Sequence, residues 1–242
     1  GFLFPDGVEV IGVDYRKFLR DPFYRHRVCR NLHLRHFRVA VSTDHLRLPT
    51  VDDVLVMVTG ADERLAMTPR SWAKHDAALA RNRAWYTRWT EVPPGLAHRM
   101  VRWVDLANAL TGRDDPLPLV RFPEDRLPPA AGTERPLAVI HPFSAVPARG
   151  PGPAVFAAVL AAIPADFDIV LSAAPGDLER CPDFRALLGD PRVRPHEGSL
   201  WEKTALLRAA RLAVSVDTSL MHLAVGAGTP TLCLASAAHL VD

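Results

Sequence analysis

Between residues 137 and 234, short apolar runs alternate with segments of helical pattern, and this alternation constrains the fold more than any other feature of the sequence. Strands that are apolar throughout and separated by helices are typical of a parallel sheet covered on both faces. Ligands of such sheets bind at the carboxyl ends of the strands. The predicted strands are Leu137–His141, Asp168–Ser172, Arg192–His196, Leu212–Val216 and Thr231–Leu234, and the predicted helices are Pro153–Ile163, Asp177–Leu188, Leu200–Ala209 and Ser219–Ala227.

A proline-rich stretch divides the chain. Few helices or central strands tolerate that density of prolines, so we expect a linker over residues 113–136 between a first domain, 1–112, and a second, 137–242. The first domain shows two convincing strands, Val8–Val13 and Phe37–Ser42. Its predicted helical segments are Val51–Val58, Ser71–Trp89 and Leu96–Leu110. We therefore expect its sheet to be truncated and the 242-residue chain to be incomplete at both ends.

Composition excludes several classes of function. The formal net charge of +2 is too small to indicate a nucleic-acid partner. The three cysteines share no metal-binding or redox spacing, which favours a reducing compartment. No apolar run approaches the roughly 20 residues that span a bilayer. We therefore expect a cytoplasmic protein.

A polar elbow follows the predicted strand Leu212–Val216. The residues Asp217, Thr218 and Ser219 are suited to begin a helix, and apolar residues at 220, 223 and 224 continue with helical spacing. The first N–H groups of such a helix point out of the carboxyl edge of the sheet and form an anion site. His222 lies one turn into the helix, on the side of Ser219. The alternative is that Asp217 only caps the helix and His222 is a surface residue.

This segment resembles the nucleotide-sugar motif of glycosyltransferase family 9, the heptosyltransferase family. The family form is D-T-G-x-x-H-x-A-x-A-x-x-x-P. In this sequence Ser219 stands where the family usually has Gly, and Gly226 stands where the family often has Ala. The resemblance implies an α/β fold of GT-B type, with two Rossmann-like domains and parallel sheets. It also implies transfer of a sugar, such as heptose from ADP-heptose, to a lipopolysaccharide core or related acceptor. Thr218, Ser219 and His222 would bind the donor diphosphate, and Asp217 would cap the helix and orient the elbow.

Two further segments resemble donor-binding parts of the family. Ser144 follows a strand, where the family has a small loop with Ser or Thr. Arg149 is adjacent to the position of a family lysine and would face the diphosphate, unless it is a solvated loop residue. Asp177 and Glu179 match a loop whose acidic residue contacts the ribose in the family. An acidic first helical turn explains the same pair.

A basic stretch over residues 16–38 is the candidate acceptor surface. The family's lipid acceptor carries phosphates and carboxylated sugars, so Arg25, Arg27 and Arg30 would face an acidic glycolipid. A solvated basic face is the alternative. An acidic acceptor of this kind would allow peripheral association with the inner membrane surface.

The resemblance also implies a reaction without a metal or other cofactor. No acidic cluster exists in the sequence to hold a metal, and helix amides and hydroxyls would stabilise the departing diphosphate instead. The family's general base lies on an opening Gly-Asp elbow, which is expected upstream of residue 1, so no base is assigned here. One alternative is a non-catalytic nucleotide-sugar-binding member of the same fold. The other, a nicotinamide-dependent oxidoreductase, requires a G-x-G-x-x-G motif that the sequence lacks.

Overall fold

The protein consists of two compact units. The computed structural model describes residues 4–92, 99–144 and 150–235. The carboxyl-terminal unit comprises residues 119–242 together with residues 1–8, and the amino-terminal unit comprises residues 9–118. None of the helices in the described ranges is long and apolar enough to cross a membrane.

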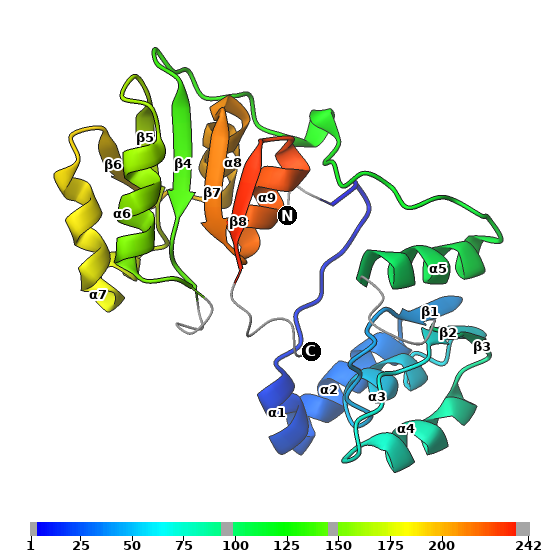
Figure 1. The fold of residues 1–242 in the computed structure, drawn as a ribbon. Coiled ribbons are helices and arrows are strands. Elements are labelled where there is room, and N and C mark those ends of the chain that lie inside the picture. Colours follow the sequence, from blue (N-terminus) through cyan, green and yellow to red (C-terminus); the bar gives the residue numbers. More distant parts are fainter. Residues whose placement is uncertain (1–3, 93–98, 145–149, 236–242) are drawn as a thin grey trace. The chain divides into compact units, whose positions relative to one another are not determined.

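Five parallel strands form the sheet of the carboxyl-terminal unit, in the order β6-β5-β4-β7-β8 (Figure 1). The alternation of strands and helices predicted for this region is therefore confirmed. The elements are β4 (Leu137–His141), α6 (Pro153–Ala162), β5 (Asp168–Ser172), α7 (Asp177–Arg180), β6 (Val193–His196), α8 (Leu200–Ala209), β7 (Leu212–Val216), α9 (Ser219–Ala227) and β8 (Thr231–Leu234), with 3-10 turns at Glu124–Arg126 and Pro182–Gly189.

Local sequence signals set the ends of the helices in this unit. Helix α6 begins at Pro153, which has no N–H to leave unpaired in the first turn. Helix α8 begins with a capping box, because the Ser199 hydroxyl accepts the N–H of Glu202 while the Glu202 carboxylate accepts the N–H of Ser199. Helix α9 ends at Ala227, and Gly228 caps it with a φ of 86°, the left-handed conformation that glycine adopts without strain.

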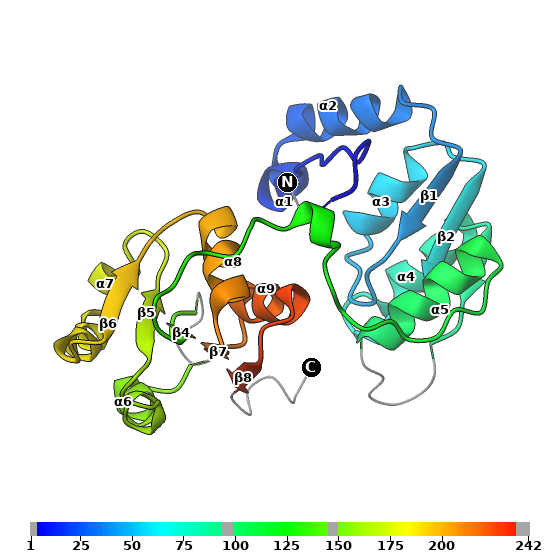
Figure 2. The ribbon, with the colours of Figure 1, turned by 90° about the horizontal axis from the view of Figure 1, so that it is seen from above.

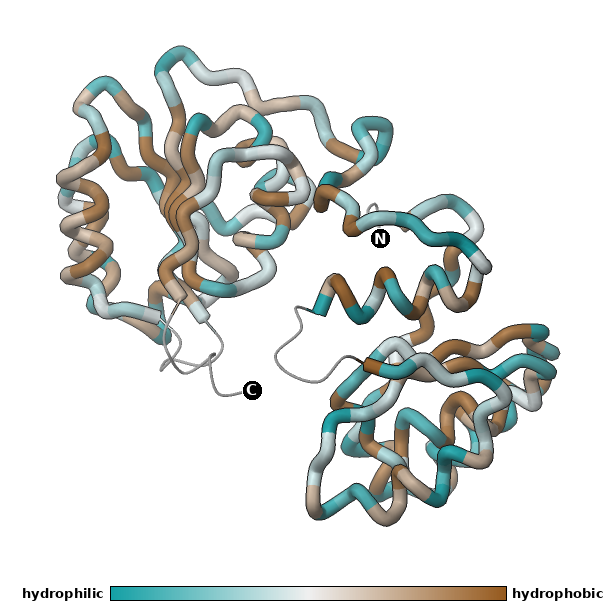
Figure 3. Tube along the Cα trace, turned by 45° about the vertical axis from the view of Figure 1, so that its right-hand side comes forward, coloured by the Kyte–Doolittle hydropathy of each residue, from teal (hydrophilic) through white to brown (hydrophobic). Residues whose placement is uncertain are grey.

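Both faces of this sheet are buried. Alternate residues of β4 point to opposite faces, so Ile140 joins a cluster with Phe156 and Leu160 of α6. On the other face, Val139 joins a cluster with residues of α8 and α9. Figure 2 shows α6 on one side of the strands and α8 and α9 on the other, and the strands are the brown, apolar centre of the unit in Figure 3.

The amino-terminal unit contains a smaller parallel sheet. Its three strands pair in the order β1-β2-β3, and α5 packs against β2 and β3. Leu65 and Met67 of β2 form a small core with Leu106 of α5. The elements are α1 (Tyr15–Arg20), α2 (Pro22–His33), β1 (Val39–Ser42), α3 (Asp52–Met57), β2 (Glu63–Met67), α4 (Asp76–Asn82), β3 (Arg88–Thr90) and α5 (Arg99–Thr111), with a 3-10 turn at Arg83–Trp85.

Three sequence-based assignments in this unit were wrong. Residues 8–13, predicted as a strand, have no strand partner, and Val8 and Val10 are 49% and 63% exposed. The sequence reading also missed β2, because its first two residues, Glu63 and Arg64, are charged and leave an apolar run of only three residues. Residues 71–89 were predicted as one helix, yet they contain only the short helix α4, a 3-10 turn and the beginning of β3. At the end of this segment, the pairing of β3 with β2 outweighs the helical pattern of the sequence.

The proline-rich stretch is only partly a linker. From residue 119 onward it belongs to the carboxyl-terminal unit. The N–H of Phe122 donates to the carbonyl of Gly226, and the N–H of Ala131 donates to the carbonyl of Ala205. Prolines interrupt α-helix and strand here, but these two backbone N–H groups bond to α9 and α8. The boundary between the units therefore lies at residue 118 rather than at the end of the prolines.

A buried ion pair lies in the amino-terminal unit. The Arg47 and Asp53 side chains have no exposed surface, and Arg47 Nε lies 3.0 Å from Asp53 Oδ1. Tyr86 and Asn82 donate to the same carboxylate, over 2.6 Å and 3.1 Å. The guanidinium also donates to the carbonyl of Met67 over 2.7 Å, at the end of β2. Arg47 thus ties the loop after β1 to α3 and to β2.

Removing one charge of this pair should destabilise the amino-terminal unit. We expect Asp53→Asn to lower its free energy of unfolding by about 3 kcal/mol, because the Arg47 guanidinium would be left buried and uncompensated. Urea unfolding followed by tryptophan fluorescence measures this, since four of the five tryptophans lie in this unit. The matched control is Asp115→Asn at the exposed Arg113–Asp115 pair, which should change stability by less than about 0.5 kcal/mol. Equal effects of the two substitutions would contradict the assignment.

Candidate functional site

The strand order of the carboxyl-terminal sheet reverses between β4 and β7. From β4 the chain continues to β5 and β6 on one side, and to β7 and β8 on the other. The loops that leave the carboxyl ends of β4 and β7 therefore diverge, and such switch points are where open parallel sheets bind ligands. His141 of β4 pairs with Ser215 of β7. Ser144 and Thr218 each lie three residues beyond this pair (144 − 141 and 218 − 215), so both follow adjacent strand ends.

The elbow, which we define as Asp217, Thr218 and Ser219, connects β7 to α9. Ser215, fully buried at the end of β7, donates its hydroxyl to the carbonyl of Val216 over 2.8 Å. The Thr218 hydroxyl lies 3.4 Å from Ser215 Oγ and donates to the same carbonyl over 3.4 Å. The first intrahelical bond of α9 runs from the N–H of His222 to the carbonyl of Thr218. The N–H groups of the first turn that precede His222 make no bond within the helix.

Thr218, and not Asp217, occupies the N-cap of α9. Thr218 has the extended backbone of an N-cap residue, with φ −148° and ψ 177°, and its side chain makes no capping hydrogen bond. The predicted role of Asp217 as the cap was therefore wrong. The reason is geometric: the chain stays extended for one more residue, and the Thr218 hydroxyl turns back toward β7 rather than forward to the helix amides.

Asp217 instead lies beside His222. Its Oδ1 is 3.7 Å from His222 Nε2, and the two side chains are 33% and 71% exposed. A carboxylate beside an imidazole can orient the ring. His222 is thus positioned on the first turn of α9 by the same elbow that presents Thr218 and the exposed Ser219.

The loop after β4 returns to the end of β7. Ser144 is half-buried just beyond β4. A Cβ on Gly150 would lie 3.4 Å from the carbonyl oxygen of Pro142 and 3.4 Å from a methyl group of Val216, so the chain at residue 150 is close to both strand ends. Arg149, the predicted diphosphate cation, lies outside the described residues. Ser144 and Gly150 nevertheless place the two ends of its loop at the switch point.

The two acidic ribose candidates lie in different surroundings. Both oxygens of Asp177 already accept hydrogen bonds over 2.6 Å, one from the N–H of Ala174 and one from Arg180. Asp177 therefore shapes the loop after β5. The Glu179 side chain is 68% exposed, and its Oε1 lies 4.0 Å from the Arg185 guanidinium. Of the two, Glu179 retains the freer carboxylate for a ligand hydroxyl.

Two buried basic side chains near this edge escaped the sequence reading. Lys203 of α8 donates to the carbonyl of Ala173 over 2.7 Å, and the Nδ1 of His141 lies 2.7 Å from the carbonyl of Ser172. Burial lowers the pKa of His141, and the Lys203 ammonium lowers it further. Burial also lowers the pKa of Lys203, against the opposing effect of the Asp177 carboxylate. Both side chains hold the loop after β5, and a lysine in a first helical turn gives no sequence signal of this role.

The basic candidates on α2 are not equivalent. Arg25 is half-buried, with its guanidinium 5.2 Å from the centre of the Phe18 ring. Arg27 and Arg30 are exposed. Arg25 therefore packs the α1–α2 pair together, whereas Arg27 and Arg30 face outward.

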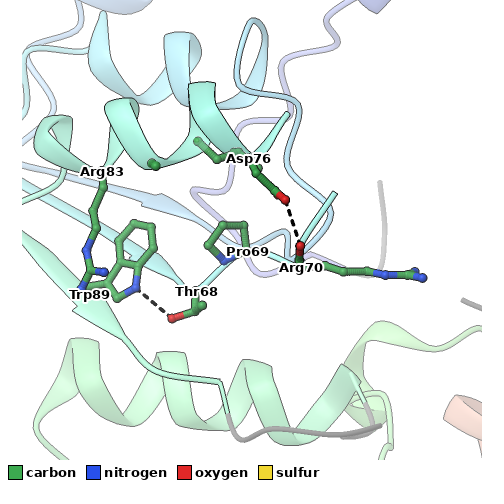
Figure 4. A pocket seen from close by; sticks show the side chains of 9 residues that line it. Thr68, Pro69, Arg70, Asp76, Arg83 and Trp89 are labelled. Carbon is green, nitrogen blue, oxygen red and sulfur yellow. Dashed lines mark hydrogen bonds between the residues drawn. The ribbon is translucent and has the colours of Figure 1, made fainter. Parts of the chain in front are cut away.

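A pocket of about 250 Å³ lies in the amino-terminal unit, beside the ends of β2 and β3 (Figure 4). Thr68, Arg83 and Trp89 are among its lining residues. Trp89 donates to the Thr68 hydroxyl over 2.9 Å, and the Arg47 and Arg83 guanidiniums each lie 5.0 Å from its ring. The polar walls of this pocket thus largely bond to one another. Within the described ranges, no cluster of three or more His, Cys, Asp or Glu residues could hold a metal ion.

Comparison with known proteins locates this arrangement in one family. The family model of glycosyltransferase family 9 (heptosyltransferase) matches residues 65–237, which are 173 of the 242 residues (237 − 65 + 1). The match includes every strand of the carboxyl-terminal sheet. A comparison with curated proteins found no match.

Solved structures share the fold at low sequence identity. A family 9 glycosyl transferase from Veillonella parvula DSM 2008 has a TM-score of 0.62 at 15% identity, over 86% of this chain and 60% of that chain. E. coli heptosyltransferase WaaC, with ADP-2-deoxy-2-fluoro heptose, has a TM-score of 0.71 at 18% identity, over 93% and 72%. E. coli ADP-heptose lps heptosyltransferase II has a TM-score of 0.57 at 16% identity, over 87% and 66%. The expected α/β fold is confirmed, and the chain spans 60% of the length of the first of these structures.

Phe122 accounts for one departure from the family motif. A Cβ on Gly226 would lie 2.2 Å from the Phe122 ring, so the two residues are complementary. We expect Gly226→Ala to destabilise the carboxyl-terminal unit by about 1–3 kcal/mol, through overpacking against this ring. Calorimetric unfolding measures the loss, and adding Phe122→Leu should recover part of it. If the Gly226→Ala variant is as stable as the parent protein, the Phe122 ring moves aside without loss of stability, and the prediction is wrong.

Proposed function

Because the chain belongs to glycosyltransferase family 9, the heptosyltransferase family, we propose that it transfers a sugar from a nucleotide-diphosphate donor. The proposed donor is ADP-heptose, and the proposed acceptor is an acidic glycan of the lipopolysaccharide-core type. The observation that supports this most is the elbow at the β4–β7 switch point. It gathers helix amides, two hydroxyls and an imidazole at the sheet edge where a diphosphate would bind.

Each donor-site residue has a separate part in this proposal. The amides of α9, together with Thr218 and Ser219, bind the diphosphate, and His222 adds a charge-assisted hydrogen bond when protonated. Ser144 approaches from the neighbouring strand end, and Arg149 supplies a cation. Glu179 accepts hydrogen bonds from the ribose. E. coli WaaC, one of the similar structures, contains ADP-2-deoxy-2-fluoro heptose, which agrees with this choice of donor.

The proposed reaction is a displacement at the anomeric carbon. The acceptor hydroxyl oxygen forms a bond to that carbon, the bond to the donor phosphate oxygen breaks, and its electron pair leaves with the diphosphate. The acceptor proton passes to a general base, to which no residue is assigned. Negative charge grows on the diphosphate as the bond breaks, so donors aimed at it stabilise the transition state more than the ground state. We propose that this stabilisation needs no metal ion.

The acceptor and the location follow from the same proposal. Exposed Arg27 and Arg30 would attract phosphates or carboxylated sugars of the acceptor. An acceptor built on a lipid would place the protein in the cytoplasm, at the inner membrane surface.

Loss of the imidazole should weaken donor binding. We expect His222→Ala to lower the affinity for ADP by roughly 10- to 150-fold, since a hydrogen bond to a charged group contributes about 1.5–3 kcal/mol. Thr218→Val should act in the same direction, because it removes a hydroxyl and keeps the shape of the side chain. Isothermal titration of each variant with ADP gives the affinities.

The control is His26→Ala, which removes an exposed imidazole from α2 in the other unit and should leave the affinity unchanged. Unchanged ADP affinity in both elbow variants would refute the diphosphate assignment. Turnover of ADP-heptose with a lipopolysaccharide-core acceptor distinguishes the transferase from a non-catalytic member that binds the same nucleotide.

Metal removal should have no effect. We expect the ADP affinity to be the same in excess EDTA as in millimolar Mg²⁺, because fixed amides, hydroxyls and cations neutralise the diphosphate. Parallel titrations with one protein preparation measure this. A tenfold or greater loss of affinity in EDTA would overturn the metal-independent mechanism.

A further inference from the structure

Lys203 is a buried cation that bonds to a neutral partner. The residue lies in the first turn of α8 and is only 8% exposed, and its ammonium donates to the backbone carbonyl of Ala173 over 2.7 Å. The Asp177 and Glu197 carboxylates favour the charged form of Lys203 but do not offset burial, so its pKa stays below the ordinary value. A methionine would fill this space without the cost of burying a charge. The ammonium is therefore better explained by the loop that it contacts than by the stability of the core.

The loop between β5 and α7 is held at two consecutive carbonyl groups. The imidazole Nδ1 of His141 lies 2.7 Å from the carbonyl of Ser172, and Lys203 donates to the next carbonyl, that of Ala173. The N–H of Ala173 in turn donates to the carbonyl of His196 over 2.9 Å. Side chains of β4 and α8 and the backbone of β6 thus fix the two successive peptide groups at which the chain leaves β5.

This anchored loop leads directly to the exposed carboxylate of Glu179. The N–H of Ala174, the residue after the one that Lys203 contacts, donates to Asp177 over 2.6 Å. Asp177 begins α7, and Glu179 lies two residues later on the same short helix. A displacement of the Ala173 carbonyl therefore moves Asp177, and α7 moves with it. Lys203 thus decides where the Glu179 carboxylate lies without itself contacting a ligand.

We propose that Lys203 is a positioning residue for recognition of the donor ribose. Its bond to Ala173 places α7 so that the Glu179 carboxylate accepts hydrogen bonds from the ribose hydroxyls. This inference deepens the proposed function and rests on it, because Glu179 contacts a ribose only if the chain binds a nucleotide donor. The ligand of this site is a ribonucleotide, and Lys203 makes the site distinguish it from a nucleotide without ribose hydroxyls.

Titration with two nucleotides separates this role from a merely structural one. The whole chain is titrated calorimetrically with ADP and with 2′,3′-dideoxy-ADP, which lacks both ribose hydroxyls, and the ratio of the two dissociation constants is the readout. We expect the parent protein to bind ADP about tenfold or more tightly than the dideoxy nucleotide, because the carboxylate accepts a charge-assisted hydrogen bond. Lys203→Met should reduce this ratio to less than about threefold, with the affinity for 2′,3′-dideoxy-ADP within about twofold of the parent's.

Thermal unfolding of the same variants verifies that they fold. Replacing a buried charge by an apolar side chain of similar volume is often neutral or stabilising, so Lys203→Met should unfold at about the temperature of the parent protein. The matched control is Thr204→Val at the next position of α8, where a fully buried residue donates its hydroxyl within the helix to the carbonyl of Leu200 over 2.6 Å. This control removes a buried polar group without touching the loop after β5, and it should leave the nucleotide ratio at the parent value.

A double variant tests whether Lys203 acts through Glu179. Glu179→Gln alone should lose the same nucleotide discrimination as Lys203→Met. The double variant Lys203→Met/Glu179→Gln should lose no more than either single variant, because two residues that support one interaction have effects that do not add.

Three results would overturn the proposal. One is a nucleotide ratio in Lys203→Met equal to that of the parent protein. Another is equal weakening of both nucleotides by Lys203→Met, which would make the lysine merely structural. The third is an additive loss of discrimination in the double variant. Failure of the proposed function is recognised separately: a parent protein that binds neither nucleotide refutes the donor assignment and this proposal with it, whereas the three results above refute only the role of Lys203.

Discussion

The parallel pairing of β4 with β7 is the constraint on which the candidate site depends. These strands are neighbours in space although β5 and β6 lie between them in the sequence. Their register brings the residues after His141 and after Ser215 to the same edge of the sheet. Without this pairing, Ser144 and Thr218 would be two polar residues about 70 positions apart (218 − 144 = 74), with no reason to meet. The fully buried β4 provides the apolar contacts that hold the pairing on both faces.

Helix α9 connects this sheet edge to the proline-rich stretch. Its amino end carries the elbow, and its carboxyl half receives Phe122 at Gly226. Arg121 also donates to the carbonyl of Val225 over 2.8 Å, near the end of the helix. A segment without regular structure therefore fixes the position of the helix whose first turn presents Thr218 and His222. This explains why a residue eight positions after Thr218 must be small (226 − 218 = 8).

Buried basic side chains have a supporting role in both units. Lys203 and His141 hold the loop after β5 by bonding to backbone carbonyls, and Arg47 holds the loop after β1 by bonding to Asp53 and to the end of β2. Each of these side chains lies near the carboxyl edge of its sheet. A buried polar side chain that bonds to a backbone carbonyl supports the loop to which that carbonyl belongs. Exposed groups such as Ser219, His222 and Glu179 are then left for a ligand.

The sequence by itself determined the class of fold, the strands of the carboxyl-terminal unit and the family. Those conclusions rest on local information: apolar runs of strand length, helix starts such as Pro153, and the spacing from Asp217 to His222. The same local reasoning failed at β2, where the charged Glu63 and Arg64 leave an apolar run of only three residues, and at residues 8–13, which have a strand composition without a neighbouring strand to pair with. Only the tertiary structure decided which polar groups already have partners. Asp177 bonds to its own loop, Arg25 packs on Phe18, and Thr218 takes the N-cap from Asp217. Hydrogen bonds and ring contacts depend on the direction of each side chain in space, which residue spacing along a chain does not specify.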